Sequence, residues 1–195
     1  MRKVCVYAGA NLGDRTSYAN EARELGKIFA TEGIELLYGG SRLGLMAEIA
    51  NQVLELGGAV TGVMPRGLFR GEVVHQGLSQ LIEVDSMHER KKQLSDLADG
   101  YIALPGGVGT FDELFEIICW GQIGLHEKPI GLLNVDGYYT PVITLLEHAV
   151  KEGFMNESNL GLVVAADNAV DLYKKMKEYE RPTMGNKWKQ LDDQN

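Results

Sequence analysis

Short apolar runs alternate with longer segments of helical periodicity along most of the chain. Each run is rich in branched and aromatic side chains, which predicts a buried strand. About seven such strands are expected, at residues 4–8, 34–38, 59–64, 81–84, 101–104, 129–134 and 161–165. Between them, apolar side chains three or four positions apart predict helices at 18–31, 45–56, 87–97, 114–118, 141–151 and 169–177.

Regular alternation of strands and helices is typical of a parallel sheet covered on both faces. The sequence therefore predicts an α/β fold, a Rossmann-like doubly wound parallel sheet of about seven strands with helices on both faces. A chain of 195 residues fits a single domain. We expect this domain to span residues 1–180 and a polar C-terminal extension to occupy residues 181–195.

A glycine-rich turn, Pro105-Gly106-Gly107-Val108-Gly109-Thr110, joins the predicted strand at 101–104 to the next helix. This geometry directs backbone N–H groups and the positive end of the helix dipole at one spot, and glycines allow close approach. We expect a phosphate there, with the Glu113 carboxylate one turn away. Thr110-x-x-Glu113 also fits a capping box, in which Glu113 only reaches back to the helix start. The spacing is neither the dinucleotide fingerprint nor a P-loop.

Two cations, Arg90 and Lys91, lie in the first turn of the helix predicted at 87–97, where the helix dipole disfavours positive charge. Ser86 and Glu89 form a capping box that explains Glu89 but not the cations. The pair is either a solvated surface charge or part of a positive site for an anionic substrate. The guanidinium fork of Arg90 suits bidentate binding of phosphate or ribose oxygens.

Ligands of doubly wound sheets bind at the carboxyl ends of the strands. The loops that follow the first five predicted strands lie at residues 9–15, 39–44, 65–72, 85–90 and 105–110. Four of these five loops contain glycine. Each glycine alone can serve only a tight turn, but their convergence on one edge of the sheet favours a shared binding site.

Composition narrows the classes of partner. The formal net charge of −8 argues against a general nucleic-acid or acidic-membrane surface, and no apolar segment approaches the length of a membrane span. Cys5 and Cys119 fall in apolar segments outside any C-x-x-C, so we expect buried free thiols in a reducing cytoplasm. The four histidines show no ligand spacing, and we expect neither a metal nor a cofactor.

Two motifs together resemble one family. Met87-His88-Glu89-Arg90-Lys91 is similar to the M-H-x-R-K element of the LONELY GUY (LOG) family, and residues 105–113 are similar to its P-G-G-x-G-T-x-x-E element. These are cytokinin-activating phosphoribohydrolases, long mislabelled as lysine decarboxylases. The similarity runs from about residue 4 to residue 159 and includes flanking segments at 38–46, 62–65 and 128–134.

The chain resembles bacterial members of this family more than plant members. Gly9-Ala10-Asn11 stands where many members have Gly-Ser-Ser, and Cys119 stands where plant members usually have Thr. These departures put hydroxyl contacts of the first loop, and one polar contact at position 119, in doubt.

The resemblance implies hydrolysis of the N-glycosidic bond of an N6-substituted adenosine 5′-monophosphate to the free base and ribose 5-phosphate. It implies that Arg90 and Glu113 are catalytic. The expected substrate-binding residues are Gly40, Ser41, Glu72, Lys91, Gly106, Gly107, Val108, Gly109, Thr110 and Asp112. The chemistry agrees, because glycosidic cleavage builds positive charge on the sugar, which a carboxylate such as Glu113 stabilises.

One other class of function stays open, and a second, the decarboxylase of the old family label, is disfavoured by the residues. A non-catalytic nucleotide or molybdenum-cofactor carrier can use the same fold, although such carriers generally lack the complete Arg/Glu pair. A pyridoxal phosphate decarboxylase needs a Schiff-base lysine, for which Lys91 is the only candidate near the site.

We also expect a homodimer. The helix after Thr110 carries more apolar surface than one sheet face can cover. That surface comprises Phe111, Leu114, Phe115, Ile117, Ile118, Trp120 and Ile123. The resemblance also implies a dimer, because members of the family associate through this region.

Overall fold

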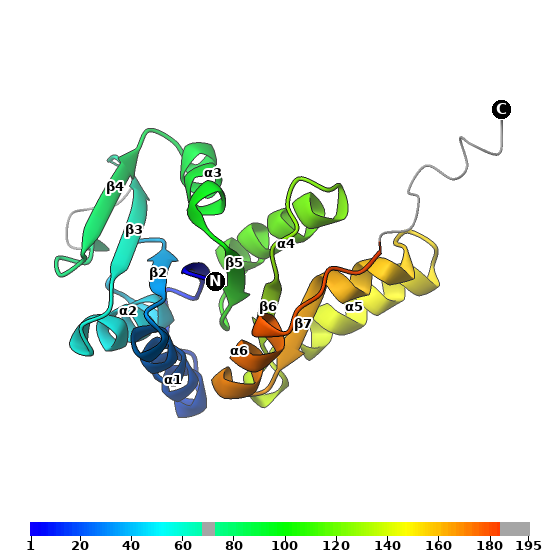
Figure 1. Ribbon diagram of the computed structural model, residues 1–195, viewed down its shortest axis with the longest axis horizontal. Helices are drawn as coiled ribbons and strands as arrows, with labels where there is room; N and C mark the ends of the chain where they lie inside the picture. Colours follow the sequence, from blue (N-terminus) through cyan, green and yellow to red (C-terminus); the bar gives the residue numbers. More distant parts are fainter. Residues whose placement is uncertain (68–72, 184–195) are drawn as a thin grey trace.

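Seven parallel strands form the centre of the computed structural model, which describes residues 1–67 and 73–183 (Figure 1). The strands are β1 (Lys3–Tyr7), β2 (Glu35–Tyr38), β3 (Val60–Pro65), β4 (Gln80–Val84), β5 (Gly100–Ala103), β6 (Ile130–Leu133) and β7 (Val163–Ala166). Their order in the sheet is β4-β3-β2-β1-β5-β6-β7. The predicted doubly wound parallel sheet is confirmed, and each strand starts and ends within two residues of its expected bounds.

Among the described residues, helices cover both faces of the sheet, and the 3-10 segments η2 (Val135–Gly137) and η3 (Glu157–Leu162) are ones that the sequence pattern does not predict. The helices are α1 (Thr16–Glu32), α2 (Gly44–Glu55), α3 (Met87–Leu97), α4 (Val108–Gln122), α5 (Thr140–Lys151) and α6 (Ala169–Lys177). Helices α1, α2 and α6 pack on one face, and α3, α4 and α5 lie on the other (Figure 1). The expected domain boundary at residue 180 stays a prediction, and residues 184–195 of the expected extension lie outside the described part.

Alternate side chains of each strand enter the two halves of the core, as the two-residue period of a strand requires. In β1, Val4 and Val6 face α1 and α2, whereas Cys5 and Tyr7 face α3 and α4. Cys5 is buried as expected, but the expectation for Cys119 is wrong, because its side chain is exposed. The buried stripe of α4 includes Leu114, Ile117, Ile118 and Gly121, and position 119 lies on the opposite side of the helix.

The switch point of the sheet lies between β1 and β5. The chain proceeds from β1 towards β4 on one side and from β5 towards β7 on the other, so the loops after β1 and β5 diverge around a crevice. The two loops are joined at their base, where the Gly9 N–H donates to the Pro105 carbonyl at 3.0 Å. A β-carbon on Gly9 would lie 3.1 Å from the Gly106 Cα, so this close contact of backbones requires glycine. The fold therefore positions the predicted glycine-rich turn at the switch point.

Candidate active site

Helix α4 begins at Val108, with Gly107 as its N-cap and no side chain capping it. Thr110 therefore lies inside the first turn, and the alternative interpretation of Thr110 and Glu113 as a capping box is wrong. The chain enters the helix early because Thr110 packs back on the turn: a β-carbon at Gly106 would lie 2.1 Å from Thr110 Oγ1. The first intrahelical bond is donated by Phe111 to the Gly107 carbonyl at 3.1 Å, which leaves the preceding N–H groups for a ligand.

Space is open above this helix start. A β-carbon built on Gly107 or Gly109 meets no atom within 4 Å among the described residues, and both glycines are exposed. An uncapped, exposed N-terminus of a fifteen-residue helix offers backbone donors and a positive dipole end to an anion.

The Glu113 side chain meets Arg90 of α3. Arg90 Nη1 lies 3.0 Å from Glu113 Oε1, and the two side chains are only 12% and 11% exposed. Arg90 Nε also donates to the Val63 carbonyl at 3.1 Å, which fixes the guanidinium plane. The capping box at the start of α3 is present, since Ser86 Oγ accepts from the Glu89 N–H at 3.2 Å and Glu89 Oε2 accepts from the Asp85 N–H at 2.8 Å.

The Glu113 carboxylate is buried but not saturated with hydrogen bonds. Among the described residues its Oε1 has no donor with hydrogen-bonding geometry, so the Arg90 contact is mainly electrostatic. Burial raises the pKa of Glu113, while the charge of Arg90 opposes that rise. A buried carboxylate with free lone pairs can accept from a ligand hydroxyl or water, or stabilise a developing cation.

A cavity of about 350 Å³ lies beside the Arg90–Glu113 pair. The loop after β1, α2, α3 and the first turns of α4 all contribute to its wall. Its lining residues are Ala8, Gly9, Ala10, Asn11, Met46, Met87, Arg90, Gly107, Gly109, Thr110, Asp112 and Glu113. An adjoining cavity of about 230 Å³ shares Gly9, Ala10, Asn11 and Gly107 and is otherwise lined by apolar and aromatic residues, Tyr18 and Tyr138 among them.

The structure brings six of the expected site residues together at this cavity, namely Arg90, Gly107, Gly109, Thr110, Asp112 and Glu113. Gly106 lines the adjoining cavity. Val108 is 83% exposed and is not in the lining. Glu72 lies outside the described residues.

Gly40 and Ser41 lie further along the sheet edge. The Gly40 carbonyl accepts from the His75 N–H at 3.0 Å, and Ser41 forms an isolated β-bridge with Val74. Both residues therefore pack against the segment before β4, and neither is in the lining of the two cavities.

Lys91 points to the outer side of α4. Its Nζ lies 2.9 Å from Glu116 Oε1 and 3.2 Å from Asp112 Oδ2, and its side chain is 14% exposed. Lys91 does not line the cavity that contains Arg90.

Gly39 supports the site in a way that the sequence interpretation missed. A β-carbon on Gly39 would lie 2.2 Å from Arg90 Nη2, so the guanidinium occupies the space that any side chain there would need. The signal in the sequence is the pair Gly39-Gly40 directly after a strand, which also fits an ordinary tight turn.

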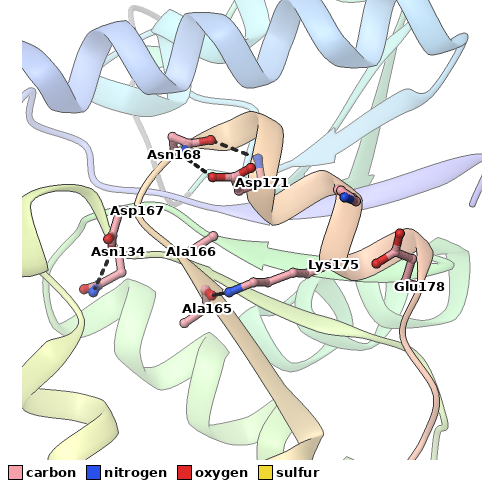
Figure 2. Close-up of a pocket in the computed structure, with 9 residues that line it drawn as sticks. Asn134, Ala165, Ala166, Asp167, Asn168, Asp171, Lys175 and Glu178 are labelled. Atoms are coloured by element: carbon pink, nitrogen blue, oxygen red, sulfur yellow. Dashed lines mark hydrogen bonds between the residues drawn. The ribbon is translucent and has the colours of Figure 1, made fainter.

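A larger hollow of about 490 Å³ lies elsewhere, at the carboxyl ends of β6 and β7 (Figure 2). Several of its polar groups bind one another. Asn134 Nδ2 donates to Asp167 Oδ1 at 3.2 Å, the Asp171 N–H donates to Asn168 Oδ1 at 2.9 Å, and Lys175 Nζ donates to the Ala165 carbonyl at 2.7 Å. It contains none of the expected site residues.

Fold and site together define the class: a doubly wound α/β protein with an open helix N-terminus and a buried Arg–Glu pair at its switch point. A family model described as "Possible lysine decarboxylase" matches residues 46–176. The chain belongs to this family, the LOG family that the two motifs indicate.

Relatives in plants are similar over most of their length. The Oryza sativa subsp. japonica protein "Cytokinin riboside 5′-monophosphate phosphoribohydrolase LOG" is 44% identical over 178 residues, which cover 91% of this chain and 74% of the relative. The Arabidopsis thaliana protein of the same description, LOG5, is 42% identical over 179 residues, covering 92% and 78%.

Solved structures share the fold at low identity. The X-ray structure of TM1055 has a TM-score of 0.70 at 23% identity and covers 91% of this chain and 99% of its own. The Moco carrier protein from Chlamydomonas reinhardtii has a TM-score of 0.69 at 22% identity, covering 91% and 96%. At such identities the likeness shows the fold alone.

None of the described helices is long and apolar enough to cross a membrane. Within residues 1–67 and 73–183, no cluster of three or more His, Cys, Asp or Glu side chains is placed to hold a metal ion.

Proposed function

We propose that this protein hydrolyses the N-glycosidic bond of N6-substituted adenosine 5′-monophosphates such as cytokinin riboside 5′-monophosphate. The products are the free base and ribose 5-phosphate. The observation that carries the proposal is the Arg90–Glu113 pair, 3.0 Å apart, in a cavity that also contains the open start of α4. The printed activity of relatives at 42–44% identity supports the substrate class.

In this proposal the 5′-phosphate binds at the first turn of α4, where Gly107, Gly109 and Thr110 line the cavity. Asp112 lies at the rim of the same wall. The sugar then lies next to Glu113, one turn further along the helix.

Glu113 acts on the sugar. As the C1′–N9 bond breaks, its carboxylate stabilises the positive charge on C1′ and orients the attacking water. The water oxygen bonds to C1′, and the proton that it loses balances the negative charge left on the departing base. Arg90 keeps Glu113 ionised and stabilises the departing adenine.

The alternative function is a non-catalytic nucleotide or molybdenum-cofactor carrier. The fold shared with the Moco carrier protein at a TM-score of 0.69 is the observation in its favour. A carrier has no need for a buried carboxylate paired with an arginine in the wall of a cavity, so the described site favours hydrolysis.

We also propose that the protein is a homodimer that pairs through α4 and α5. Helix α5 contains no fully buried residue in the single chain, although Val142, Ile143, Leu145 and Leu146 make it strongly apolar. Close by in the chain, Leu125 is 68% and Phe154 is 87% exposed. Surface of this kind is typical of an interface between subunits. Light scattering at micromolar concentration should give twice the chain mass, and a monomer mass alone would contradict the dimer.

We also propose that the protein binds no nucleic acid and lies in the cytoplasm. The net charge of −8 supports the absence of a nucleic-acid partner. Two free cysteines, one of them exposed, support a reducing cytoplasm.

One assay of free base tests the reaction. The panel consists of AMP, isopentenyladenosine 5′-monophosphate, the two nucleosides without phosphate, and GMP. We expect base from the adenosine monophosphates and little from the nucleosides. Nucleosides cleaved as fast as their monophosphates would contradict the phosphate site, and no base from any member would favour the carrier.

A further inference from the structure

Two neighbouring tyrosines, Tyr138 and Tyr139, follow η2 and donate hydrogen bonds to the glycine-rich turn between β5 and α4. The Tyr139 hydroxyl donates to the Leu104 carbonyl at 2.6 Å, and the Tyr138 hydroxyl donates to the Gly106 carbonyl. Neither tyrosine is in the lining of the cavity beside the Arg–Glu pair, and Tyr138 lines only the adjoining one. The two hydroxyls therefore contact the wall of the candidate active site from outside it.

The Tyr138 side chain is fixed by its surroundings. Its ring meets the rings of Tyr18 and Tyr139 edge to face, with centroids 5.8 Å and 5.2 Å away. The backbone before it is anchored too, because Asp136 Oδ2 accepts from Ser17 Oγ at 2.6 Å. Asp136 also has a φ of 52°, a left-handed conformation that few residues other than glycine adopt. Removing the Tyr138 hydroxyl alone should therefore leave the ring in place.

The two hydroxyls act on peptide groups that differ in one respect. The C=O and N–H of a trans peptide point in opposite directions, and no peptide bond of the described chain is cis. The Tyr139 bond orients the peptide between Leu104 and Pro105, which has no N–H. The Tyr138 bond orients the peptide between Gly106 and Gly107, and with it the Gly107 N–H. Gly107 is the N-cap of α4 and lines the cavity.

The peptide between Gly106 and Gly107 needs an anchor more than an ordinary peptide does. Because neither residue has a β-carbon, the backbone on both sides of it rotates freely. Gly106 has to be glycine, since a β-carbon there would lie 2.1 Å from Thr110 Oγ1, and Gly107 borders open space. A backbone donor binds an anion best when its direction is fixed beforehand, because no ordering cost is then added on binding.

We propose that Tyr138 is a positioning residue for the substrate phosphate. Its hydroxyl holds the Gly106 carbonyl so that the Gly107 N–H stays directed at the anion site at the start of α4. Tyr139 does not share this role, because the peptide that it holds has no N–H to direct. The inference rests on the proposed function for the identity of the anion and on the hydroxyl–carbonyl bond for its geometry.

Binding of ribose 5-phosphate, measured by calorimetry, tests the role in three variants. Tyr138→Phe removes the hydroxyl and keeps the ring. Tyr139→Phe is the matched control, and Tyr173→Phe is a distant one, whose hydroxyl donates to Glu32 at 3.0 Å. We expect the dissociation constant to rise about tenfold in Tyr138→Phe and to change less than about twofold in both controls. Affinity for adenosine, which has no phosphate, should change less than about twofold in all three.

A readout without ligand shows whether Tyr138 acts through the backbone. The amide resonance of Gly107 in the nuclear magnetic resonance spectrum should move in Tyr138→Phe, because its peptide loses a hydrogen bond at the carbonyl. It should stay in place in Tyr139→Phe.

Stability should change in the opposite order to phosphate binding. Tyr139 is fully buried and Tyr138 is half-buried. Tyr139→Phe should therefore lower Tm by about 3–6 °C, and Tyr138→Phe should lower it less. In turnover of isopentenyladenosine 5′-monophosphate, Tyr138→Phe should raise KM about tenfold and change kcat less than about threefold. Tyr139→Phe should keep the wild-type KM.

Other outcomes overturn the positioning role. Unchanged affinity of Tyr138→Phe for ribose 5-phosphate would show that the bond is only structural, and an equal loss in Tyr139→Phe would show a general loosening of the turn. Weaker binding with an unmoved Gly107 resonance would show that the hydroxyl itself contacts the ligand. A wild type that binds ribose 5-phosphate but releases no base contradicts the proposed reaction instead, and the binding comparison still decides the role of Tyr138. A wild type that binds no ribose 5-phosphate contradicts both.

Discussion

Helices α4 and α6 both begin at the carboxyl edge of the same sheet, yet their N-termini are capped differently. In α6 the Asn168 side chain accepts from the Asp171 N–H at 2.9 Å, and Glu21 Oε2 accepts from the Ala169 N–H at 2.7 Å. In α4 no side chain caps the helix, and the space above Gly107 is open.

The larger of the two hollows beside these helices is not the one that contains the expected site residues. The one beside α6 is larger, at about 490 Å³ against about 350 Å³, but most of the polar side chains labelled in Figure 2 form hydrogen bonds within the hollow. The one beside α4 contains a buried carboxylate oxygen without a donor in the described chain. The buried Arg90–Glu113 pair beside an open helix start, more than volume, therefore distinguishes the α4 site.

The largest expected effect comes from neutralising the carboxylate in the α4 cavity. Glu113→Gln keeps the shape but cannot stabilise positive charge, so kcat should fall at least ~10²-fold. The matched control is Glu178→Gln in the α6 hollow, where the exposed carboxylate should be dispensable. Steady-state assays of base release measure kcat for both variants. Near-wild-type turnover of Glu113→Gln would assign catalysis to another group.

Gly39→Ala should come next. The added methyl group would lie 2.2 Å from Arg90 Nη2, so the guanidinium must leave its place beside Glu113. A displacement of about 1 Å can cost up to ~10²-fold in kcat, and we expect a loss of about 10–100-fold. Arg90→Ala should lose a similar amount, and the double variant should be no worse than Arg90→Ala. Additive losses would show that Gly39 acts independently of Arg90.

The pH dependence should report the same carboxylate. Burial raises the pKa of Glu113 above its ordinary 4.5, against the lowering charges of Arg90 and Lys91 and with Asp112 and Glu116 raising it further. Because the ionised form is needed, kcat/KM, which reports the free enzyme, should fall as the pH drops through a pKa higher than 4.5. The residual rate of Glu113→Gln should lack this limb. A limb at or below 4.5 would contradict the burial argument.

The smallest effect on activity should come from the cap of α6. Asn168→Ala removes an N-cap acceptor, which costs about 1 kcal/mol of stability. Tm should fall by about 2–4 °C while kcat and KM stay at wild-type values. A loss of turnover in this variant would mean that the α6 hollow contributes to the reaction.

The sequence pattern predicts the strands and helices well because period-two and period-3.6 patterns follow directly from which faces are buried. The helix at Met87–Leu97 has the predicted bounds. The predicted start of α4 was wrong, because the spacing Thr110-x-x-Glu113 fits the start of a helix and equally fits positions inside a helix that begins earlier. Only the packing of Thr110 against Gly106 decides between them.

The site was predictable in part. Arg90 stands out as a charge that local structure does not need, whereas Glu113 stands out only through the glycine-rich turn before it and the family motif. The contact of Gly39 with Arg90, and the two carboxylates around Lys91, depend on how β2, α3 and α4 meet in space. The exposure of Cys119 follows from the orientation of α4, which an apolar segment alone does not reveal.

A crystal structure with ribose 5-phosphate bound is the most direct test that the open start of α4 is the working site. The account predicts the phosphate within hydrogen-bonding distance of the Gly109 and Thr110 N–H groups, with C1 of the sugar facing Glu113. Ribose 5-phosphate in the α6 hollow, or none at α4 at saturating concentration, would contradict it.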